Sequence, residues 1–283
     1  MDAPPVMPTV RLPDEAAVPA LGMGTWHMGE DPARRRREVD ALRLGIELGM
    51  TLIDTAEMYG DGGAEEVVGE AIADRRDDVF IVSKVYPHNA SARGAIAACE
   101  RSLRRLRTDR IDCYLLHWRG RIPISETVDA FEQLCASGKI ARWGVSNFDV
   151  EHLQQLAKVN AGDHCATDQV LYNVGERAAD WRLLAWCGNH AMPAMAYSPV
   201  GQGALLRDPA LRKIARAAQL TPSQLALAWT LRHPHVIAIP KSDNPRHLRE
   251  NRAAAGIRLD QATLQAIDSA FPPPRRATRL SVI

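Results

Sequence analysis

Short hydrophobic runs alternate along the chain with longer segments in which hydrophobic residues recur every three or four positions. Eight short runs are strand candidates, at residues 19–26, 51–54, 79–84, 111–118, 141–147, 165–170, 192–199 and 235–242. The first is the weakest of the eight because two glycines, Gly22 and Gly24, interrupt its apolar run "PALGMGTW". The other runs are largely continuous in their apolar residues, which is typical of parallel strands that are covered on both faces.

The longer segments show the pattern of amphipathic helices. Ile96, Cys99, Leu103 and Leu106 are spaced so that they lie on one helical face. Another helix is predicted to begin after Thr221, a candidate N-cap, because a proline follows at the first helical position.

This alternation of strands and helices predicts an α/β protein with parallel strands joined by helical crossovers. Eight strands in 283 residues fit a closed (β/α)8 TIM barrel, and an open doubly wound sheet is the alternative. The open dinucleotide-binding sheet is disfavoured because no GxGxxG follows the first strand, and "GMGTW" lacks the third glycine. Since no Pro/Gly/Ser-rich linker divides the chain, we expect a single domain over residues 1–283.

Composition and charge narrow the classes of function. The chain is 46% hydrophobic and 24% charged, with a formal net charge of +1, so nothing indicates binding to nucleic acid or to an anionic membrane. The densest basic patch, Arg34–Arg37, leads into an amphipathic pattern and is interpreted as the solvated start of a helix.

The cysteines and the chain ends indicate a reducing compartment. Five cysteines occur without a CxxC or a zinc-type spacing, so we expect small buried side chains and no metal site. The N-terminus lacks the pattern of a signal peptide, and no apolar run is long enough to span a membrane. We therefore expect a cytoplasmic protein, and no exposed apolar stripe argues against a monomer.

Polar residues end most of the predicted strands. In a barrel, the carboxyl ends of the strands open onto one face, where active sites lie. The residues that would gather there are Asp54, Lys84, His117, Ser146, Asn147, Gln169, Tyr197, Ser198, Lys241 and Ser242.

Three titratable groups at successive strand ends suggest a catalytic cluster. Singly, Asp54 could be a cap, Lys84 a solvated loop residue and His117 an ordinary core histidine, but their conjunction favours catalysis. Asp54 and Lys84 on adjacent strands can form a buried ion pair, and a charged lysine beside Tyr59 would lower the pKa of that phenol. Such a tyrosine can donate a proton to a carbonyl oxygen, while His117 hydrogen-bonds the same oxygen. Because carbonyl reduction also needs hydride, a cofactor is required.

At this point the sequence resembles the aldo-keto reductase family, in particular its small bacterial members. The resemblance rests on "GMGTW", "LIDTAEMYG", "VSKV", "DCYLLHW", "GKIARWGVSNF", "QVLYN", "AYSPVGQG" and "IPKSDNPRHLRENRAA", in that order along nearly the whole chain. It implies a (β/α)8 barrel and an oxidoreductase that uses NADPH without a Rossmann domain. The family's catalytic tetrad maps onto Asp54, Tyr59, Lys84 and His117.

The same resemblance implies which residues hold the cofactor. Ser146, Asn147 and Gln169 should bind the nicotinamide carboxamide, and Tyr197 should stack on the ring. Ser198 and the following loop should lie along the pyrophosphate, and Lys241 and Ser242 should meet the 2′-phosphate. The remaining implied cofactor residues are Gly24, Thr25, Trp26, Gly201, Gln202, Gly203, His247, Glu250 and Asn251, and the implied substrate-pocket residues are Trp26, Tyr86 and Trp118.

Two departures from the family pattern bear on specificity. His247 stands where related reductases commonly carry an arginine, and Arg246 lies one residue earlier, about 100° away on a helix. We therefore expect NADPH to be preferred over NADH by a smaller margin than in members with the arginine. The C-terminal tail after residue 271 is short, which suggests an open pocket and broad specificity that includes small dicarbonyls such as methylglyoxal.

Two other functions remain open at this stage. A Schiff-base aldolase-type lyase would use Lys84 as a nucleophile, although pairing with Asp54 would keep that lysine protonated. A non-catalytic nicotinamide-nucleotide sensor or auxiliary subunit would keep the same barrel without turnover.

Overall fold

The computed structural model describes residues 6–283, and its centre is a barrel of eight short parallel strands. Each strand pairs in parallel with the next one along the chain. The strands are β3 (Met23–Gly24), β4 (Leu52–Asp54), β5 (Phe80–Val85), β6 (Cys113–Leu116), β7 (Trp143–Ser146), β8 (Asp168–Leu171), β9 (Ala194–Tyr197) and β10 (Val236–Ala238). All eight strand predictions are confirmed, including the weakest.

Contacts between the first and last barrel segments close the sheet. The amide of Gly22 donates to the carbonyl oxygen of Ala238 at 2.9 Å, and Gly24 forms a parallel bridge with Lys241. A Cβ atom at Gly24 would lie 2.8 Å from the carbonyl oxygen of Ile239, so this close approach requires glycine. The barrel prediction is confirmed over the open sheet.

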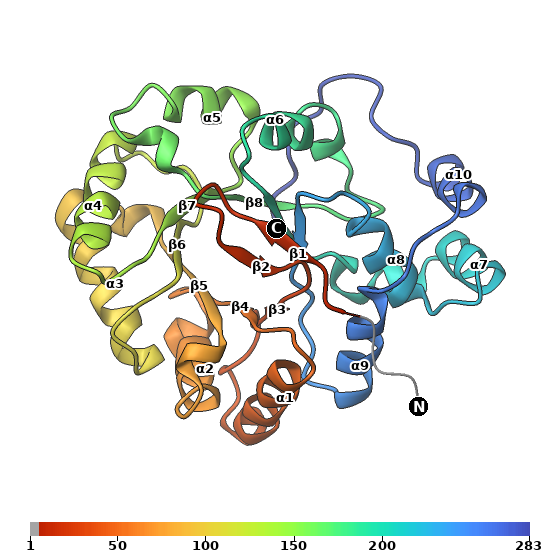
Figure 1. The fold of residues 1–283 in the computed structure, drawn as a ribbon, viewed down its shortest axis with the longest axis horizontal. Coiled ribbons are helices and arrows are strands. Elements are labelled where there is room, and N and C mark those ends of the chain that lie inside the picture. The colour runs from red at the N-terminus through yellow and green to blue at the C-terminus, as the bar shows by residue number, and fades with distance from the viewer. Residues whose placement is uncertain (1–5) are drawn as a thin grey trace.

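Helices surround the barrel (Figure 1). They are α1 (Arg35–Glu47), α2 (Gly63–Ala71), α3 (Ala92–Leu106), α4 (Ile124–Ala136), α5 (Val150–Leu156), α6 (Leu183–Asn189), α7 (Pro209–Ala217), α8 (Pro222–Thr230), α9 (Pro245–Ala254) and α10 (Gln261–Ala270). Thr221 caps α8 as predicted, and its hydroxyl and the Gln224 side chain form a reciprocal capping box.

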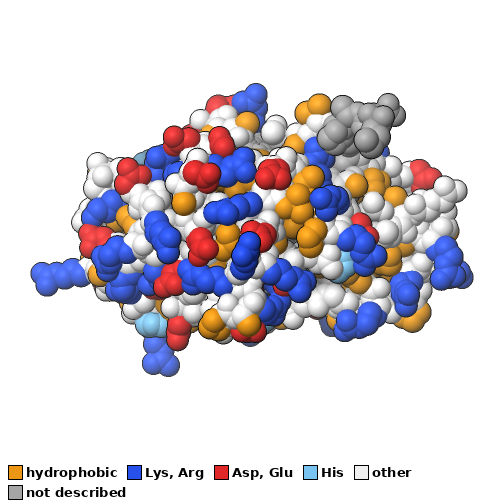
Figure 2. Space-filling model, turned by 90° about the horizontal axis from the view of Figure 1, so that it is seen from below, with side chains coloured by type: hydrophobic (Ala, Val, Ile, Leu, Met, Phe, Trp, Pro, Cys, Tyr) orange, Lys and Arg blue, Asp and Glu red, His pale blue; other side chains and the backbone are white. Residues whose placement is uncertain are grey.

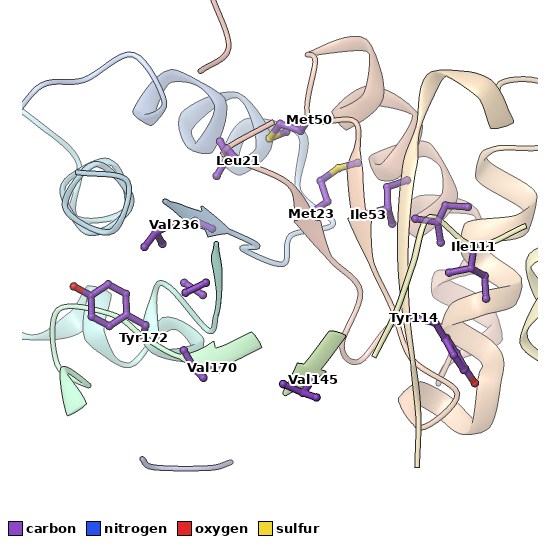
Figure 3. Packing of buried hydrophobic residues seen from close by; sticks show 14 of the residues in the cluster. Leu21, Met23, Met50, Ile53, Ile111, Tyr114, Val145, Val170, Tyr172 and Val236 are labelled. Atoms are coloured by element: carbon purple, nitrogen blue, oxygen red, sulfur yellow. The ribbon is translucent and has the colours of Figure 1, made fainter. Parts of the chain in front are cut away.

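Both faces of the strands are buried, which explains their continuous apolar runs. Ile53 packs in the large core between strands and helices, part of which is drawn in Figure 3, whereas its neighbour Leu52 belongs to a second cluster. The same alternation separates Ile81 from Val82. Along these two strands, successive side chains therefore alternate between the core under the helices and the second cluster.

A hairpin that the sequence analysis did not predict precedes the barrel. β1 (Thr9–Arg11) pairs antiparallel with β2 (Ala17–Pro19), and the pair lies across the middle of the barrel in Figure 1. Val10, Leu12 and Val18 are buried against the same cluster that contains Leu52. The hairpin therefore closes the amino-terminal end of the barrel, opposite the predicted site.

Candidate active site

A cavity of about 420 Å³ lies at the carboxyl ends of the barrel strands. The predicted site residues that line it are Trp26, Tyr59, His117, Trp118, Ser146, Asn147, Gln169 and Tyr197. These side chains are far apart in the sequence, and the parallel strands bring them to one mouth. The cavity therefore coincides with the cluster that was inferred from strand ends.

A buried ion pair lies beneath this cavity. Asp54 is the last residue of β4, and Lys84 lies on the paired strand β5. The Nζ atom of Lys84 donates to both carboxylate oxygens of Asp54 at 2.8 Å and to the carbonyl oxygen of Thr55 at 2.8 Å. It also lies 3.2 Å from the hydroxyl of Tyr59. With these hydrogen bonds the lysine is held as a donor, which disfavours its use as the nucleophile of a Schiff-base lyase.

The pKa of Tyr59 differs from the sequence-based prediction. Burial raises the pKa of this phenol well above its ordinary value, and the charge of Asp54 acts in the same direction. The predicted lowering by Lys84 does not prevail, because both oxygens of Asp54 contact that ammonium group and offset its charge. Burial likewise lowers the pKa of Lys84 and raises that of Asp54, and the attraction between the two groups opposes both shifts. The phenol of Tyr59 therefore stays protonated at neutral pH.

His117 follows β6 and faces Tyr59 across the cavity. The centroids of the two rings lie 5.7 Å apart in an edge-on arrangement. Burial, followed by the charge of Lys84, lowers the pKa of His117 to about 2. The imidazole is therefore neutral and carries one N–H donor. Its Nδ1 atom is buried without a hydrogen bond in the described part of the chain.

Hydrogen bonds join the residues expected to bind a nicotinamide carboxamide. The hydroxyl of Ser146 donates to the carbonyl oxygen of Gln169 at 2.8 Å, and Tyr197 donates to Oδ1 of Asn147 at 2.9 Å. Nε2 of Gln169 donates to Asp54 at 2.7 Å. Within residues 6–283 this leaves the Gln169 side-chain oxygen, in the cavity wall, without a protein donor, so it can accept from an amide of a ligand. The residues present fit a carboxamide group.

A second cavity, of about 250 Å³, lies between α7, the start of α8 and α9. The predicted residues Lys241, Ser242, His247, Glu250 and Asn251 line it together. Asn251 is buried, and its side-chain oxygen accepts a hydrogen bond from Ser223 at 2.9 Å. Lys241 forms no ion pair within the described residues, so its charge is available to a ligand. This donor set fits an adenosine with a phosphate group.

Arg212 also lines the second cavity, and the sequence analysis did not identify it. It is exposed on α7 and has no ion-pair partner in residues 6–283. The only signal in the sequence was a basic residue in the first turn of a helix, and nothing there placed it opposite Lys241. Arg246 does not line the cavity, but its guanidinium group lies 3.3 Å from Nε2 of His247.

Several predicted residues lie outside both cavity walls. Thr25 is buried, and its hydroxyl donates to the carbonyl oxygen of Asp54 at 2.9 Å. Gly24 belongs to the barrel closure described above. Tyr86 stacks on His88 and meets Trp118 edge-on. It does not line the cavity, so its contact with a substrate stays a prediction.

The loop expected along the pyrophosphate connects β9 to α7. In the sequence it follows Tyr197, which lines the first cavity, and precedes Arg212, which lines the second. Ser198, Gly201, Gln202 and Gly203 all adopt positive φ angles. Only glycine adopts this conformation without steric strain. These four residues line neither of the two cavities, so their contact with a cofactor stays a prediction.

The C-terminal tail corrects the expectation of an open pocket. Its residues Arg279, Leu280, Val282 and Ile283 line the active-site cavity. The hydroxyl of Ser281 donates to the carboxylate of Glu176 at 3.0 Å and holds the tail against the barrel. Though short, the tail reaches back over the barrel mouth and narrows it. Other lining residues that the sequence analysis missed are Met58, Arg119, Asp149 and His152.

In residues 6–283 no helix is long and apolar enough to cross a membrane. Within the same range no group of three or more His, Cys, Asp or Glu side chains is arranged to hold a metal ion.

Comparisons with known proteins agree with this geometry. A family model described as "Aldo/keto reductase family" matches residues 20–271. Methylglyoxal reductase YeaE of Escherichia coli (strain K12) is 50% identical over 279 residues, which cover 97% of this chain and 98% of that protein. Glyoxal reductase of Bacillus subtilis (strain 168) is 33% identical over 264 residues, 92% of each chain.

Solved structures give the same result. An aldo-keto reductase from Klebsiella pneumoniae in complex with NADPH is 52% identical and superimposes with a TM-score of 0.95, covering 98% of this chain and 100% of that one. A likeness of this extent in both sequence and barrel means that the chain belongs to the aldo/keto reductase family.

Proposed function

We propose that this protein reduces small aldehydes and dicarbonyls to alcohols, with NADPH as the reductant and Tyr59 as the proton donor. The observation that supports this most is the Asp54–Lys84–Tyr59 hydrogen-bond chain, which ends at the cavity that His117 also lines. NADPH-dependent carbonyl reduction is the activity of the family to which the chain belongs.

Each member of the cluster has a distinct part in this proposal. When bound, NADPH supplies the hydride. Tyr59, protonated because it is buried, gives its hydroxyl proton to the carbonyl oxygen as that oxygen gains charge. Lys84 holds the phenol oxygen through the 3.2 Å contact and offsets the charge left on it. Neutral His117 donates a hydrogen bond that orients the carbonyl.

The two cavities divide the binding of the cofactor. Ser146, Asn147 and Gln169 would hold the carboxamide of the nicotinamide, and Tyr197 would cover one face of the ring. In the second cavity, Lys241 supplies a positive charge for the 2′-phosphate. Ser242, Arg212 and Asn251 line the same cavity and complete the proposed adenosine site.

The size and lining of the first cavity support a small substrate. Trp26 and Trp118 form aromatic walls, and the C-terminal tail closes one side. A cavity of about 420 Å³ that is shared with a nicotinamide ring leaves room for a compact carbonyl compound. Two relatives are a methylglyoxal reductase and a glyoxal reductase, so methylglyoxal is the first substrate to test.

The test compares Tyr59→Phe with the wild type in NADPH oxidation driven by methylglyoxal. Loss of a positioned general acid should lower kcat by about 10²- to 10⁴-fold. The Kd for NADPH, measured by quenching of tryptophan fluorescence, should stay within about twofold because the ring keeps its packing. Tyr86→Phe removes a hydroxyl outside the cavity wall and should keep near wild-type kcat.

Retention of more than about a tenth of wild-type kcat by Tyr59→Phe would place the proton donor elsewhere. If the wild-type protein bound NADPH but oxidised it with no member of a panel of aldehydes and dicarbonyls, a nucleotide sensor would describe it better. A borohydride-trapped adduct on Lys84 would instead favour the lyase.

A further inference from the structure

The four arginines at the start of α1 have different partners. Arg35 pairs with Glu66 and Glu70 on α2, at 3.2 and 3.0 Å. Arg34 and Arg37 instead reach the loop between β10 and α9, where both contact Asp243. The run is therefore not simply the solvated helix start expected from sequence. Figure 2 shows the face of the molecule that carries α1 and α9, where basic and acidic side chains are interspersed.

Asp243 is held by three hydrogen bonds from these two arginines. An Nη2 atom of Arg34 lies 2.7 Å from Oδ2 and that of Arg37 3.3 Å from Oδ1. Nε of Arg37 donates to the Asp243 backbone carbonyl at 3.1 Å. Burial opposes ionisation, but the hydrogen bond from Arg34 and the charges of Lys241 and Arg37 hold the pKa of Asp243 below its ordinary value. Its carboxylate is therefore ionised and directed toward α1.

The position of this carboxylate needs an explanation. Asp243 follows Lys241 and Ser242 directly, so a negative charge lies beside the residues proposed to bind the 2′-phosphate. A free carboxylate there would repel a phosphate and would compete for the ammonium group of Lys241. In the structure Lys241 forms no ion pair with it, although its charge acts on Asp243. The two arginines hold the carboxylate that would otherwise compete.

A second contact of Arg34, through Glu38, connects it to the loop after β3. Nε of Arg34 lies 3.9 Å from Oε1 of Glu38, a fully buried carboxylate on α1. The other oxygen of Glu38 accepts a hydrogen bond from the backbone amide of Gly29 at 2.9 Å. Arg34 therefore lies between the loop after β3 and the loop after β10, which limits its freedom to leave Asp243.

We propose that Arg34 and Arg37 are positioning residues for cofactor choice: they engage the Asp243 carboxylate, so that the charge of Lys241 is left for the 2′-phosphate of NADPH. This inference rests on the proposed function, which places that phosphate at Lys241. It assigns part of the NADPH specificity to a helix that does not line the nucleotide cavity. NADH lacks the 2′-phosphate, so its binding should not depend on these arginines.

The experiment measures the Kd values for NADPH and NADH in the Arg34→Gln/Arg37→Gln double variant. The Kd for NADPH should rise about fivefold to twentyfold, because the Asp243 carboxylate, partly screened by solvent, would then repel the 2′-phosphate and compete for Lys241. The Kd for NADH should change less than about twofold, because NADH has no 2′-phosphate. The matched control, Arg35→Gln/Arg36→Gln, removes the same charge from the same run without touching Asp243. It should leave the ratio of the two Kd values near that of the wild type.

A rescue variant separates electrostatics from a structural role. Adding Asp243→Asn to the Arg34→Gln/Arg37→Gln variant removes the competing charge and should restore most of the affinity for NADPH. If affinity were lost but not restored, or if the control pair lowered it equally, the inference would be overturned. Failure of the proposed site has a different signature: Lys241→Met would then leave the NADPH to NADH ratio unchanged. A collapse of that ratio in Lys241→Met with no effect in Arg34→Gln/Arg37→Gln would overturn only the present inference.

Discussion

At the level of single residues, burial determines the protonation of the two side chains proposed to meet the carbonyl oxygen. Burial raises the pKa of Tyr59 well above its ordinary value and, with Lys84, lowers that of His117 to about 2. A group titrates only near its own pKa. Between those limits Tyr59 remains a neutral acid and His117 a neutral donor.

The first prediction concerns the pH dependence of turnover. The kcat for reduction, at saturating cofactor and substrate, should change less than about twofold between about pH 5.5 and 8.5. Over that range His117 stays neutral, since it would gain a proton only near pH 2, and Tyr59 keeps its proton. The measurement uses constant ionic strength and several buffers. An acid limb with an apparent pKa near that of a free imidazole, lost in His117→Asn, would contradict this account.

At the level of elements, a network around Asp180 joins segments that are distant in sequence. The Tyr172 hydroxyl donates to Oδ1 of Asp180 at 2.5 Å, and Nε of Arg177 donates to Oδ2 at 2.8 Å. Arg177 also contacts Asp268 on α10 at 2.7 Å and the carbonyl oxygen of Phe271 at 2.6 Å. The network therefore fastens α10, and the tail that follows it, to the segment after β8.

The second prediction is that Asp180→Asn destabilises the fold by about 3 kcal/mol at neutral pH, because it removes the charged acceptor that Tyr172 and Arg177 share. Burial opposes the shift, but His233, Tyr172 and Arg177 together lower the pKa of Asp180 to about 2. This stabilisation is therefore complete above about pH 4, the unfolded pKa, and is lost as the pH falls through about 2.

Urea unfolding at pH 7, 5 and 3 measures this effect. The difference in unfolding free energy between wild type and Asp180→Asn should be the same at pH 7 and 5 and should be smaller at pH 3. Asp163→Asn removes an exposed carboxylate that has no ion pair in residues 6–283 and serves as the control. Equal stability of Asp180→Asn and wild type at pH 7 would show that the network is not stabilising.

At the level of the whole molecule, the two ends of the chain close opposite ends of the barrel. The β1–β2 hairpin covers the amino-terminal end, and the last residues line the cavity at the other end. Figure 1 marks the C-terminus over the middle of the barrel. The tail therefore forms part of the wall of the first cavity although it contains no helix or strand.

The third prediction follows from this arrangement. Truncation after Thr278 removes Arg279, Leu280, Val282 and Ile283 from the wall of the first cavity. The kcat/KM for a bulky aromatic aldehyde, divided by that for methylglyoxal, should rise by about fivefold or more, because steric exclusion is relieved for the larger substrate. The control, Ser281→Ala, loses the hydrogen bond to Glu176 but keeps the apolar wall. An unchanged ratio after truncation would mean that the tail does not restrict the substrate.

The sequence by itself determined the barrel and about half of the lining of the first cavity. Each barrel strand is buried on both faces, so it leaves a continuous apolar run that is legible without tertiary information. The carboxyl ends of parallel strands share one face, so Asp54, Lys84 and His117 could be placed together from their positions in the chain. The pairing of Asp54 with Lys84 added Tyr59, and the resemblance to a family assigned the nicotinamide roles of Ser146, Asn147 and Gln169.

Only the tertiary structure decided features that depend on contacts between remote segments. Arg34 and Asp243 are 209 positions apart, and neither the periodicity around Arg34 nor the motif around Asp243 indicates the other. The three-residue strands of the hairpin are too short to leave a periodic signal, and the tail has none. The pKa of Tyr59 was predicted in the wrong direction for the same reason: the cost of removing a phenolate from water depends on everything that packs around it, whereas the sequence shows only its nearest charged neighbours.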